Sequence, residues 1–474
     1  MNSGGNVDNV KKRPHFRVPH VYVLLFFIMA AAAIATYILP AGQFERIVDE
    51  ATGRTIIDPN SFHYIESAPV SFFFLFKSIP LGIRAAVDVI FMVVLTMAGM
   101  EIINQTGALK IAIANMIKAI KGKEYFLLII VGLVFTAIGA FVGWAEGIMM
   151  FVPIGVALSI AMGFDALVGF DIVTLMAGMG FAVGVTNIYT VGVAQGLLGL
   201  PLFSGLGFRM VMLIVLTIVS FLWILRYAKK VKENPAASHV SDLHLDIEEI
   251  DLENPGEFTL RHKLVLVTLV VGFVAAVYGC LKLGWFMVEI GACFTLAGVI
   301  GGLFAGMSLD EIAENYGLGA RKIISAGITI GLARAILVIL EQGLIVDTII
   351  FYLANMVQSL PTSLTALGMY LIQVIINTFI PSGSGQAVVT IPILGPLAEI
   401  IGSQQQVAVI AYQLGDGFTN RIIPTSAALM GGLAMAGGIP WSRYARHVAP
   451  IMGIWIVIGG IFVIIADMLA LGPF

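Results

Sequence analysis

Charge is what this sequence has least of. Only 12% of its 474 residues are Asp, Glu, Lys or Arg, whereas 59% are hydrophobic and the mean hydropathy is +0.97. A water-soluble domain carries charge on about a quarter of its residues, so the composition excludes that class. Apolar runs of about 17 to 25 residues recur between Val21 and Ala470, and each could cross a bilayer as a helix. We therefore predict an all-α polytopic membrane protein.

Cysteine is also scarce, and the charges nearly cancel. Cys280 and Cys293 are the only cysteines, and both lie in apolar runs, so they say little about redox chemistry. The net charge of −3, with basic residues confined to short patches beside apolar runs, argues against nucleic acid as a partner. No His/Glu spacing typical of a metal site occurs, and the Gly383-Ser384-Gly385 run lacks the base and acid partners of a serine nucleophile. We expect no enzyme and no cofactor.

The basic residues predict how the chain is oriented, because short loops rich in Lys and Arg stay in the cytoplasm. Residues 1–20 carry Lys11, Lys12 and Arg13, which indicates a cytoplasmic N-terminus. The acidic stretch from Gln43 to Ser67 suits the outside, and residues 229–262 form a polar linker expected in the cytoplasm. Continuing the pattern places the C-terminus outside.

The two halves of the chain resemble each other. Pro153 and Pro392, Thr186 and Thr425, and Pro201 and Pro440 are each separated by 239 positions. Single matches arise by chance in apolar sequence, but several at one offset near half the chain length indicate an internal repeat. We predict a first repeat over residues 21–228 and a second half over residues 263–474.

Each half contains two apolar arms joined by a Gly-rich tip. The arms span about 125–162 in the first half and about 364–401 in the second, where the tip reads IPSGSGQ. The basic markers make the two pairs enter from opposite sides, which predicts inverted re-entrant hairpins; two full crossings in each half are the alternative. Irregular backbone is tolerated at membrane depth only where it is buried in protein or lines an aqueous cavity. The tips are therefore candidate binding positions, where helix ends present partial charges.

An interrupted helix follows each pair of arms. The first covers about 171–199 and is broken at Val185-Thr186-Asn187, and the second covers about 407–436 and is broken from Gly415 to Asn420 and at Pro424-Thr425-Ser426. A hairpin tip facing a broken helix in each repeat is the midplane site expected of inverted-repeat transporters. The alternative is that these small residues only allow close helix packing.

At these motifs the sequence resembles the YfcC-type subgroup of the C4-dicarboxylate anaerobic carrier family, within the ion transporter superfamily. GWAEG, VGVTN, PSGSGQ and PTSAALMGGLA carry the resemblance, which extends from Val18 to the end. It implies a bacterial inner-membrane protein with a scaffold domain, usually dimeric, and a transport domain that moves like an elevator. The Ser-Asn-Thr tips of better-known dicarboxylate carriers are absent, so their specificity does not carry over. The subgroup is associated instead with antiport of basic amino acids.

Two acids favour a cationic guest. Glu146 lies at the first tip and Asp416 at the second helix break, and a carboxylate inside the membrane is a functional hypothesis by default. Trp144 could stack on a guanidinium, although a packing role is an equal alternative. The tip amides could meet the α-carboxylate of a substrate. Internal pairing of Asp416 with Arg421 and of Glu341 with Arg334 is the competing interpretation.

These arguments predict a secondary active transporter of a small amino acid, arginine- or ornithine-like, that works by exchange or coupling to Na⁺ or H⁺. A carrier for C4-dicarboxylates or other small carboxylates is the alternative. The expected partners are a small-molecule substrate, the lipid bilayer and a second copy of the chain. The candidate substrate-binding residues are Gly143, Trp144, Glu146, Thr186, Asn187, Ser382, Gly383, Ser384, Asp416, Asn420, Thr425 and Ser426. A Na⁺ ion is expected, if anywhere, at Thr186, Asn187, Ser384, Thr425 and Ser426.

Overall fold

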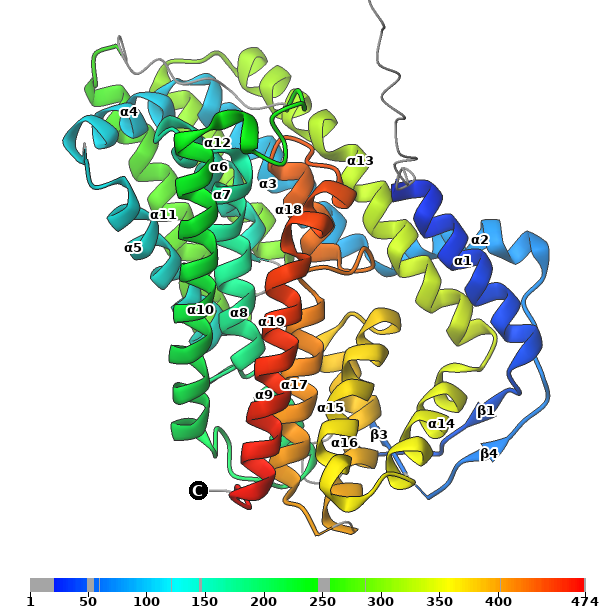
Figure 1. The fold of residues 1–474 in the computed structure, drawn as a ribbon. Coiled ribbons are helices and arrows are strands. Elements are labelled where there is room, and N and C mark those ends of the chain that lie inside the picture. The colour runs from blue at the N-terminus through cyan, green and yellow to red at the C-terminus, as the bar shows by residue number, and fades with distance from the viewer. Residues whose placement is uncertain are drawn as a thin grey trace, which may run out of the picture.

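The computed structural model describes residues 21–48, 55–58, 60–120, 122–144, 147–245, 256–285, 287–400 and 402–472. Helices make up nearly all of it (Figure 1). Among the described residues, eight helices are long and apolar enough to cross a membrane. The composition of the sequence therefore predicted the class of fold correctly. The expected N-terminal segment 1–20 and the acid Glu146 lie outside the described residues.

The first half begins with a membrane-length helix and ends with another. Its helices are α1 (Val21–Ile38), α2 (Phe72–Ala85), α3 (Val87–Gln105), α4 (Ala108–Ile120), α5 (Glu124–Ala137), the π-helical η1 (Ile138–Val142), the 3₁₀ helix η2 (Gly147–Phe151), α6 (Val152–Ala161), α7 (Ala166–Phe170), the π-helical η3 (Asp171–Leu175), α8 (Met176–Val183), α9 (Val191–Leu197), α10 (Leu206–Glu233) and the 3₁₀ helix η4 (Pro235–Ala237). Between α1 and α2, β1 (Gly42–Gln43) pairs antiparallel with β4 (His63–Tyr64), and β2 (Arg46–Val48) pairs antiparallel with β3 (Thr55–Ile57).

The described part of the second half contains helices and connecting loops but no strands. Its helices are α11 (Leu260–Lys282), α12 (Met287–Ala305), α13 (Leu309–Gln342), α14 (Val346–Gln358), α15 (Thr362–Phe379), α16 (Gly383–Ile400), α17 (Gln405–Thr419), α18 (Ala427–Met435) and α19 (Trp441–Met468).

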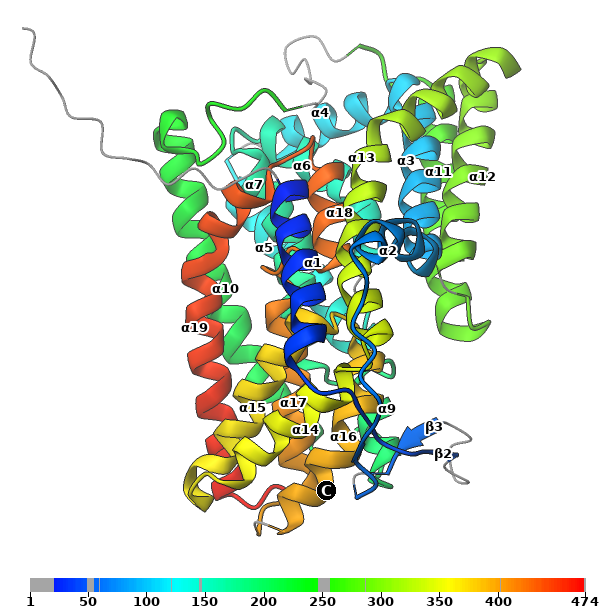
Figure 2. The same ribbon diagram turned by 90° about the vertical axis from the view of Figure 1, so that its right-hand side faces the viewer.

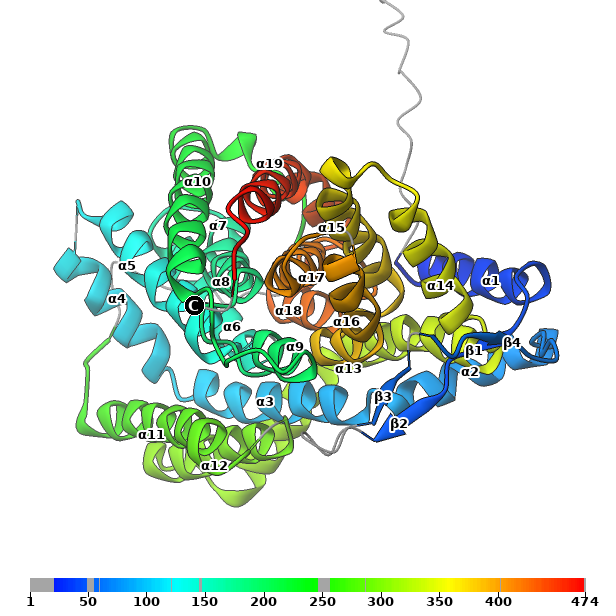
Figure 3. The same cartoon turned by 90° about the horizontal axis from the view of Figure 1, so that it is seen from below.

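Two groups of helices pack side by side. One, here the scaffold group, comprises α1–α3 and α11–α13, in which α3 contacts α12 and α13 extensively (Figure 3). The other, here the hairpin group, comprises α5–α10 and α15–α19, with α17 contacting α8, α15, α16 and α19. The amphipathic α4 and α14 link the two groups. Contacts between α13 and α18 join the two groups directly.

Within the hairpin group, the two pairs of arms open toward opposite ends of the molecule. In Figure 1 the connections of α5 to α4 and of α6 to α7 lie in the upper half, whereas those of α15 to α14 and of α16 to α17 lie at the bottom. The view in Figure 2 agrees, with α4, α6 and α7 above and α14, α15 and α16 below. That the two hairpins enter the membrane from opposite sides as inverted repeats stays a prediction.

Three predicted boundaries differ from the observed ones. The irregular part of the second tip is shorter than IPSGSGQ, because α16 already begins at Gly383. Ser382 starts that helix: its carbonyl accepts from N of Gln386 (2.7 Å) and its hydroxyl from N of Gly385 (3.4 Å). The first broken helix begins at Ala166 rather than at Asp171, because Asp165 caps it by accepting from N of Val168 (2.9 Å).

The predicted linker is also shorter than residues 229–262. The α10 helix continues through Glu233, where a Lys229–Glu233 pair one turn apart supports it. At its other end, α11 begins at Leu260, after a capping box formed by Thr259 and His262.

Candidate binding site

The first tip lies against the first broken helix. Gly143 ends η1 with a left-handed backbone (φ 74°), which glycine adopts without strain. The Thr186 hydroxyl donates to O of Phe141 (2.8 Å), and N of Thr186 donates to O of Ala140 (3.1 Å). A Cβ atom on Gly143 would collide with the carboxamide of Asn187. The structure thus brings together the predicted residues Gly143, Thr186 and Asn187.

A matching contact joins the second tip to the second break. The Thr425 hydroxyl donates to O of Thr378 (3.1 Å), at the end of the first arm of that hairpin. Thr186 and Thr425 therefore make the same kind of bond at corresponding positions of the two halves. Ser426 caps α18 by accepting from N of Leu429 (3.4 Å). Both side chains hold backbone in place, as expected where helices are broken.

The second tip also meets the first break, which no spacing in the sequence predicted. A Cβ atom on Gly383 would collide with Cγ2 of Thr190 and would lie 3.2 Å from Oδ2 of Asp416. The Tyr412 hydroxyl donates to O of Gly383 (2.6 Å). Elements from both halves therefore converge at Gly383.

Asp416 was predicted in the second break, and this placement is wrong. It lies inside α17, one turn before the helix ends at Thr419, because the two glycines beside it do not interrupt the helix. The side chain is fully buried, and its Oδ1 accepts from Nδ2 of Asn420 (3.2 Å). Asn377 donates to O of Asp416 (2.9 Å) and to the Thr419 hydroxyl (2.6 Å). The acid nevertheless faces the tip, as its proposed role requires.

Several buried polar atoms around the tips and breaks lack a hydrogen-bond partner within the described part of the chain. They are Asn187 Nδ2, Thr190 Oγ1, Asn377 Oδ1, Gln386 Oε1, Gln413 Oε1 and Asn420 Oδ1. Buried polar groups in proteins are nearly always hydrogen-bonded. A cluster of such atoms at one place can therefore hold a small polar guest. Four of these residues were not predicted; for three of them, Asn377, Gln386 and Gln413, an amide inside an apolar helix was a signal that could have found them.

Some predicted site residues are placed differently. Trp144 is only 3% exposed and covers Gly147 in the apolar core, so it packs the first hairpin rather than stacking on a guest. Ser384 is exposed on the first turn of α16. The stem of Arg421 lies against Gly178 of α8. Among the described residues, no group of three His, Cys, Asp or Glu residues is placed to hold a metal ion.

Among the cavities that the described residues form between the scaffold group and the hairpin group, two are lined by corresponding residues of the two halves. The lower cavity, of about 430 Å³, reaches the second tip at Ser382 and Gly385. Its charged lining residues are Arg46, Arg334, Glu341 and Asp347, of which Arg46 and Asp347 form a two-pronged ion pair (2.7 and 3.1 Å).

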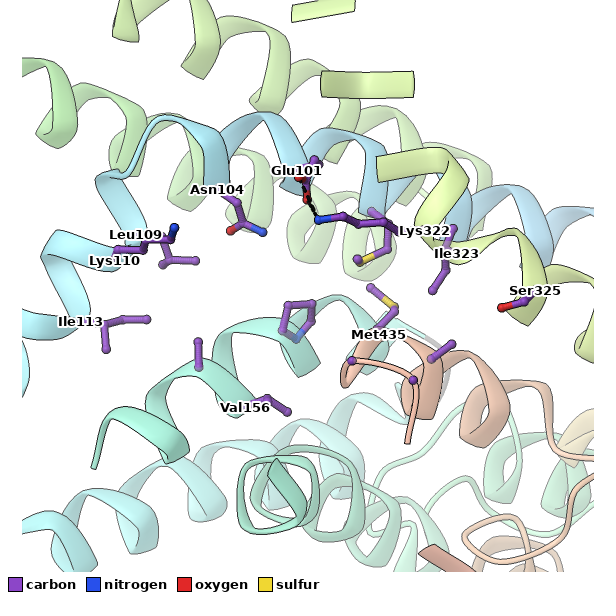
Figure 4. A pocket seen from close by; sticks show the side chains of 16 residues that line it. Glu101, Asn104, Leu109, Lys110, Ile113, Val156, Lys322, Ile323, Ser325 and Met435 are labelled. Atoms are coloured by element: carbon purple, nitrogen blue, oxygen red, sulfur yellow. Dashed lines mark hydrogen bonds and ion pairs between the residues drawn. The ribbon is translucent and has the colours of Figure 1, made fainter. Parts of the chain in front are cut away.

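The upper cavity, of about 160 Å³, is bounded by α3, α4, α6, α13 and α18 (Figure 4). Glu101 and Lys322 point toward each other across its wall, and Nζ of Lys322 lies 3.0 Å from both carboxylate oxygens. Met97, Glu101 and Asn104 line this cavity, and Leu337, Glu341 and Leu344, each 240 positions later, line the lower one. The two halves therefore contribute corresponding residues to opposite cavities.

A buried contact between a histidine and a carboxylate in the hairpin group was not predicted. Nε2 of His447 lies 2.8 Å from Oδ2 of Asp171, and both side chains are at most 1% exposed. The sequence signal was an acid at the start of an apolar run, which is rare enough in membranes to mark a functional candidate.

The chain is similar to other proteins over almost its whole length. The family described as C4-dicarboxylate anaerobic carrier (DcuC) matches residues 18–468. A protein of Escherichia coli (strain K12) with the name "Putative basic amino acid antiporter YfcC" is 28% identical over 502 aligned residues, which cover 98% of this chain and 99% of that protein. An uncharacterized protein of Haemophilus influenzae (strain ATCC 51907 / DSM 11121 / KW20 / Rd) is 27% identical over 504 residues, covering 97% and 99%.

Two solved structures show a weaker likeness. The YdaH transporter of Alcanivorax borkumensis is 15% identical with a TM-score of 0.43, over 95% of this chain and 99% of that one. MtrF of Neisseria gonorrhoeae is 16% identical with a TM-score of 0.43, over 96% of each chain.

Proposed function

The chain belongs to the C4-dicarboxylate anaerobic carrier family, and from this premise we propose that it is a secondary active transporter of a small basic amino acid, arginine- or ornithine-like. The observation that carries the proposal is the position of Asp416. This fully buried carboxylate faces Gly383 at the second tip, where elements of both halves meet. An acid held at membrane depth favours a guest with a positive charge.

The surrounding groups suit the rest of an amino acid. The unpartnered oxygens of Thr190, Asn377 and Asn420 can accept hydrogen bonds from an ammonium or guanidinium group. The N-terminus of the 18-residue α16, which starts at Gly383, offers backbone amides and a positive dipole end for an α-carboxylate. A zwitterion with a cationic side chain would match both ends of this arrangement.

The two cavities support alternating access. They lie on opposite sides of the contact between the scaffold group and the hairpin group, and corresponding residues of the two halves line them. A sliding of the hairpin group past the scaffold group would open the site to one cavity at a time, by exchange or by coupling to Na⁺ or H⁺. The scaffold group is then the expected contact surface of a homodimer.

A carrier for C4-dicarboxylates or other small carboxylates is the second candidate. The lower cavity favours it, because Arg334 and Arg46 line that cavity together with Ser382 of the tip. Arg46 is paired with Asp347, which weakens its claim on a substrate. The family description also names dicarboxylates.

Counterflow in proteoliposomes distinguishes the two candidates. Labelled arginine should exchange against internal arginine, and labelled succinate should not exchange against internal succinate. Asp416→Asn should slow arginine exchange at least about tenfold, a loss of about 1.4 kcal/mol. Asp88→Asn, at an exposed carboxylate on the first turn of α3, is the matched control and should exchange normally. Exchange of succinate alone would overturn the amino acid assignment.

A further inference from the structure

Three titratable side chains form a continuous chain from the surface into the hairpin group. His239 lies on the surface loop after η4, with its ring exposed. Its Nδ1 lies 3.1 Å from Nδ1 of the buried His447, whose Nε2 lies 2.8 Å from Oδ2 of Asp171. The loop belongs to the region predicted to face the cytoplasm. Each step is a hydrogen-bond distance, so a proton can pass without any side chain moving far.

The two nitrogens of His447 make it a relay rather than an end point. A proton donated by His239 would bind His447 at Nδ1, and the proton on Nε2 would then pass to Asp171. At the His447 ring one bond to hydrogen forms and one breaks. Rotation of the ring, or transfer of the protons back along the same path, then restores the starting tautomer. Histidine is the side chain suited to this, because its unperturbed pKa lies near physiological pH.

The groups that face His447 hold the imidazole in this orientation. They are Asp171 from η3, His239 from the surface loop, Trp223 and Tyr227 from α10, and Tyr444 from its own helix. Around His239, partial burial and the neighbouring charges of His447, Lys230 and Arg443 lower its pKa, whereas Asp165 acts in the opposite direction. A lowered pKa makes the protonated His239 ring a better donor to His447.

Asp171 carries the chain to the broken helices. It opens the π-helical turn η3, and such turns occur frequently at functional sites. Its Oδ1 and the hydroxyl of the buried Tyr444 lack a hydrogen-bond partner among the described residues. Tyr444 also packs against the ring of His447, with ring centroids 6.3 Å apart. Because Asp171 lies in the first broken helix, a proton that reaches it arrives in the same element that carries Thr186 and Asn187.

We propose that His239, His447 and Asp171 form a proton path, and that the proton is the ion coupled to transport. This proposal rests on the proposed transport function. Without a proton, the Asp171–His447 pair carries one net negative charge, and with it the pair is neutral. Moving an uncompensated buried charge is costly, so the hairpin group should slide more readily when the pair is protonated. The sliding step would then carry one proton per cycle.

The test separates proton coupling from substrate binding. Proteoliposomes with an internal pH dye are assayed in two ways: arginine counterflow without a gradient, and proton movement driven by an arginine gradient. In Asp171→Asn, whose side chain stays neutral, gradient-driven proton movement should fall at least about tenfold, whereas counterflow should stay within about twofold of the native rate. In His447→Gln, which removes the relay, gradient-driven proton movement should fall by the same factor. His239→Gln, a surface change that leaves the interior untouched, should slow proton movement while the fold is retained.

The control and the contrary outcomes are specific. His244→Gln alters an exposed histidine of the same loop and should change neither measurement. Native protein that exchanges arginine without moving protons, or His447→Gln with native proton movement, would overturn the proton path. Absence of all arginine counterflow would instead contradict the proposed function. In that case an infrared titration of the native protein and of both variants still tests the path. The signal of the protonated Asp171 carboxyl must be absent in Asp171→Asn, and its titration midpoint must shift in His447→Gln.

Discussion

At the scale of single residues, the site depends on positions where a side chain would not fit. Gly383 is the clearest example, because it meets Thr190 of the first break, Asp416 of α17 and the hydroxyl of Tyr412 at once. A glycine in a tip is often explained by turn geometry alone. Here Gly383 is the first residue of α16, and its role is to let α16, α17 and the first break approach each other.

Gly383→Ala should therefore damage transport more than folding. The added Cβ would push the tip away from Thr190, at a cost of about 1–3 kcal/mol, and would displace the tip from Asp416. We expect lost arginine counterflow with a protein that still purifies as a single species. Gly453→Ala in α19, where no atom lies within 4 Å of the new Cβ, is the control and should transport normally. Native counterflow by Gly383→Ala would show that the tip does not bind substrate.

At the scale of elements, close helix contacts fix the scaffold group. α3 and α12 touch backbone to backbone, since a Cβ on Gly99 would collide with O of Phe294 and a Cβ on Gly298 would lie 2.5 Å from O of Gly99. In lipid, where the hydrophobic effect does not drive helices together, such small-residue contacts are a main source of stability. The two helices should therefore behave as one rigid unit.

Gly99→Ala tests this contact. Backbone atoms of α12 cannot move aside cheaply, so the change should lower the free energy of unfolding by about 1–3 kcal/mol. The measurement is the thermal unfolding midpoint in detergent. Gly317→Ala in α13, whose new Cβ would meet nothing within 4 Å, should leave the midpoint unchanged or slightly raised. A midpoint for Gly99→Ala equal to that of Gly317→Ala would exclude a tight α3–α12 contact.

At the scale of the whole molecule, the ends of the helices define two faces. α1 begins and α10 ends at the top in Figure 1, whereas the described chain ends at the bottom, after α19. The Lys- and Arg-rich helix ends gather at the top, which the distribution of basic residues predicts to be cytoplasmic. The lower cavity would then open outward.

Labelling with a membrane-impermeant maleimide tests this orientation. In a chain whose Cys280 and Cys293 are replaced by alanine, Asn60→Cys should react in intact spheroplasts, because it lies exposed in the lower loop. Asp242→Cys, exposed in the upper loop, should react only after permeabilisation. The cysteine-free chain serves as the blank. The opposite labelling pattern would reverse the assigned faces of the membrane and the direction in which each cavity opens.

Local sequence determined much of this protein. Hydropathy over single runs predicted the membrane helices, and the repeat at a fixed offset pointed to corresponding positions such as Thr186 and Thr425, each of which donates to a carbonyl oxygen in its own half. These features follow from the sequence because each depends on residues close together in the chain: an apolar run must bury its backbone polar groups in its own helix, and glycine, proline and serine interrupt that helix locally.

Only the tertiary structure decided which groups meet. Thr190 and Gly383 touch across nearly 200 positions, Asp416 faces the tip from within a helix, and His239 and His447 bridge the surface to Asp171. Such contacts depend on how helices from distant parts of the chain cross, and crossing is governed by side-chain shape on several helices at once. Periodicity in one segment carries no information about which residue of another segment will lie opposite.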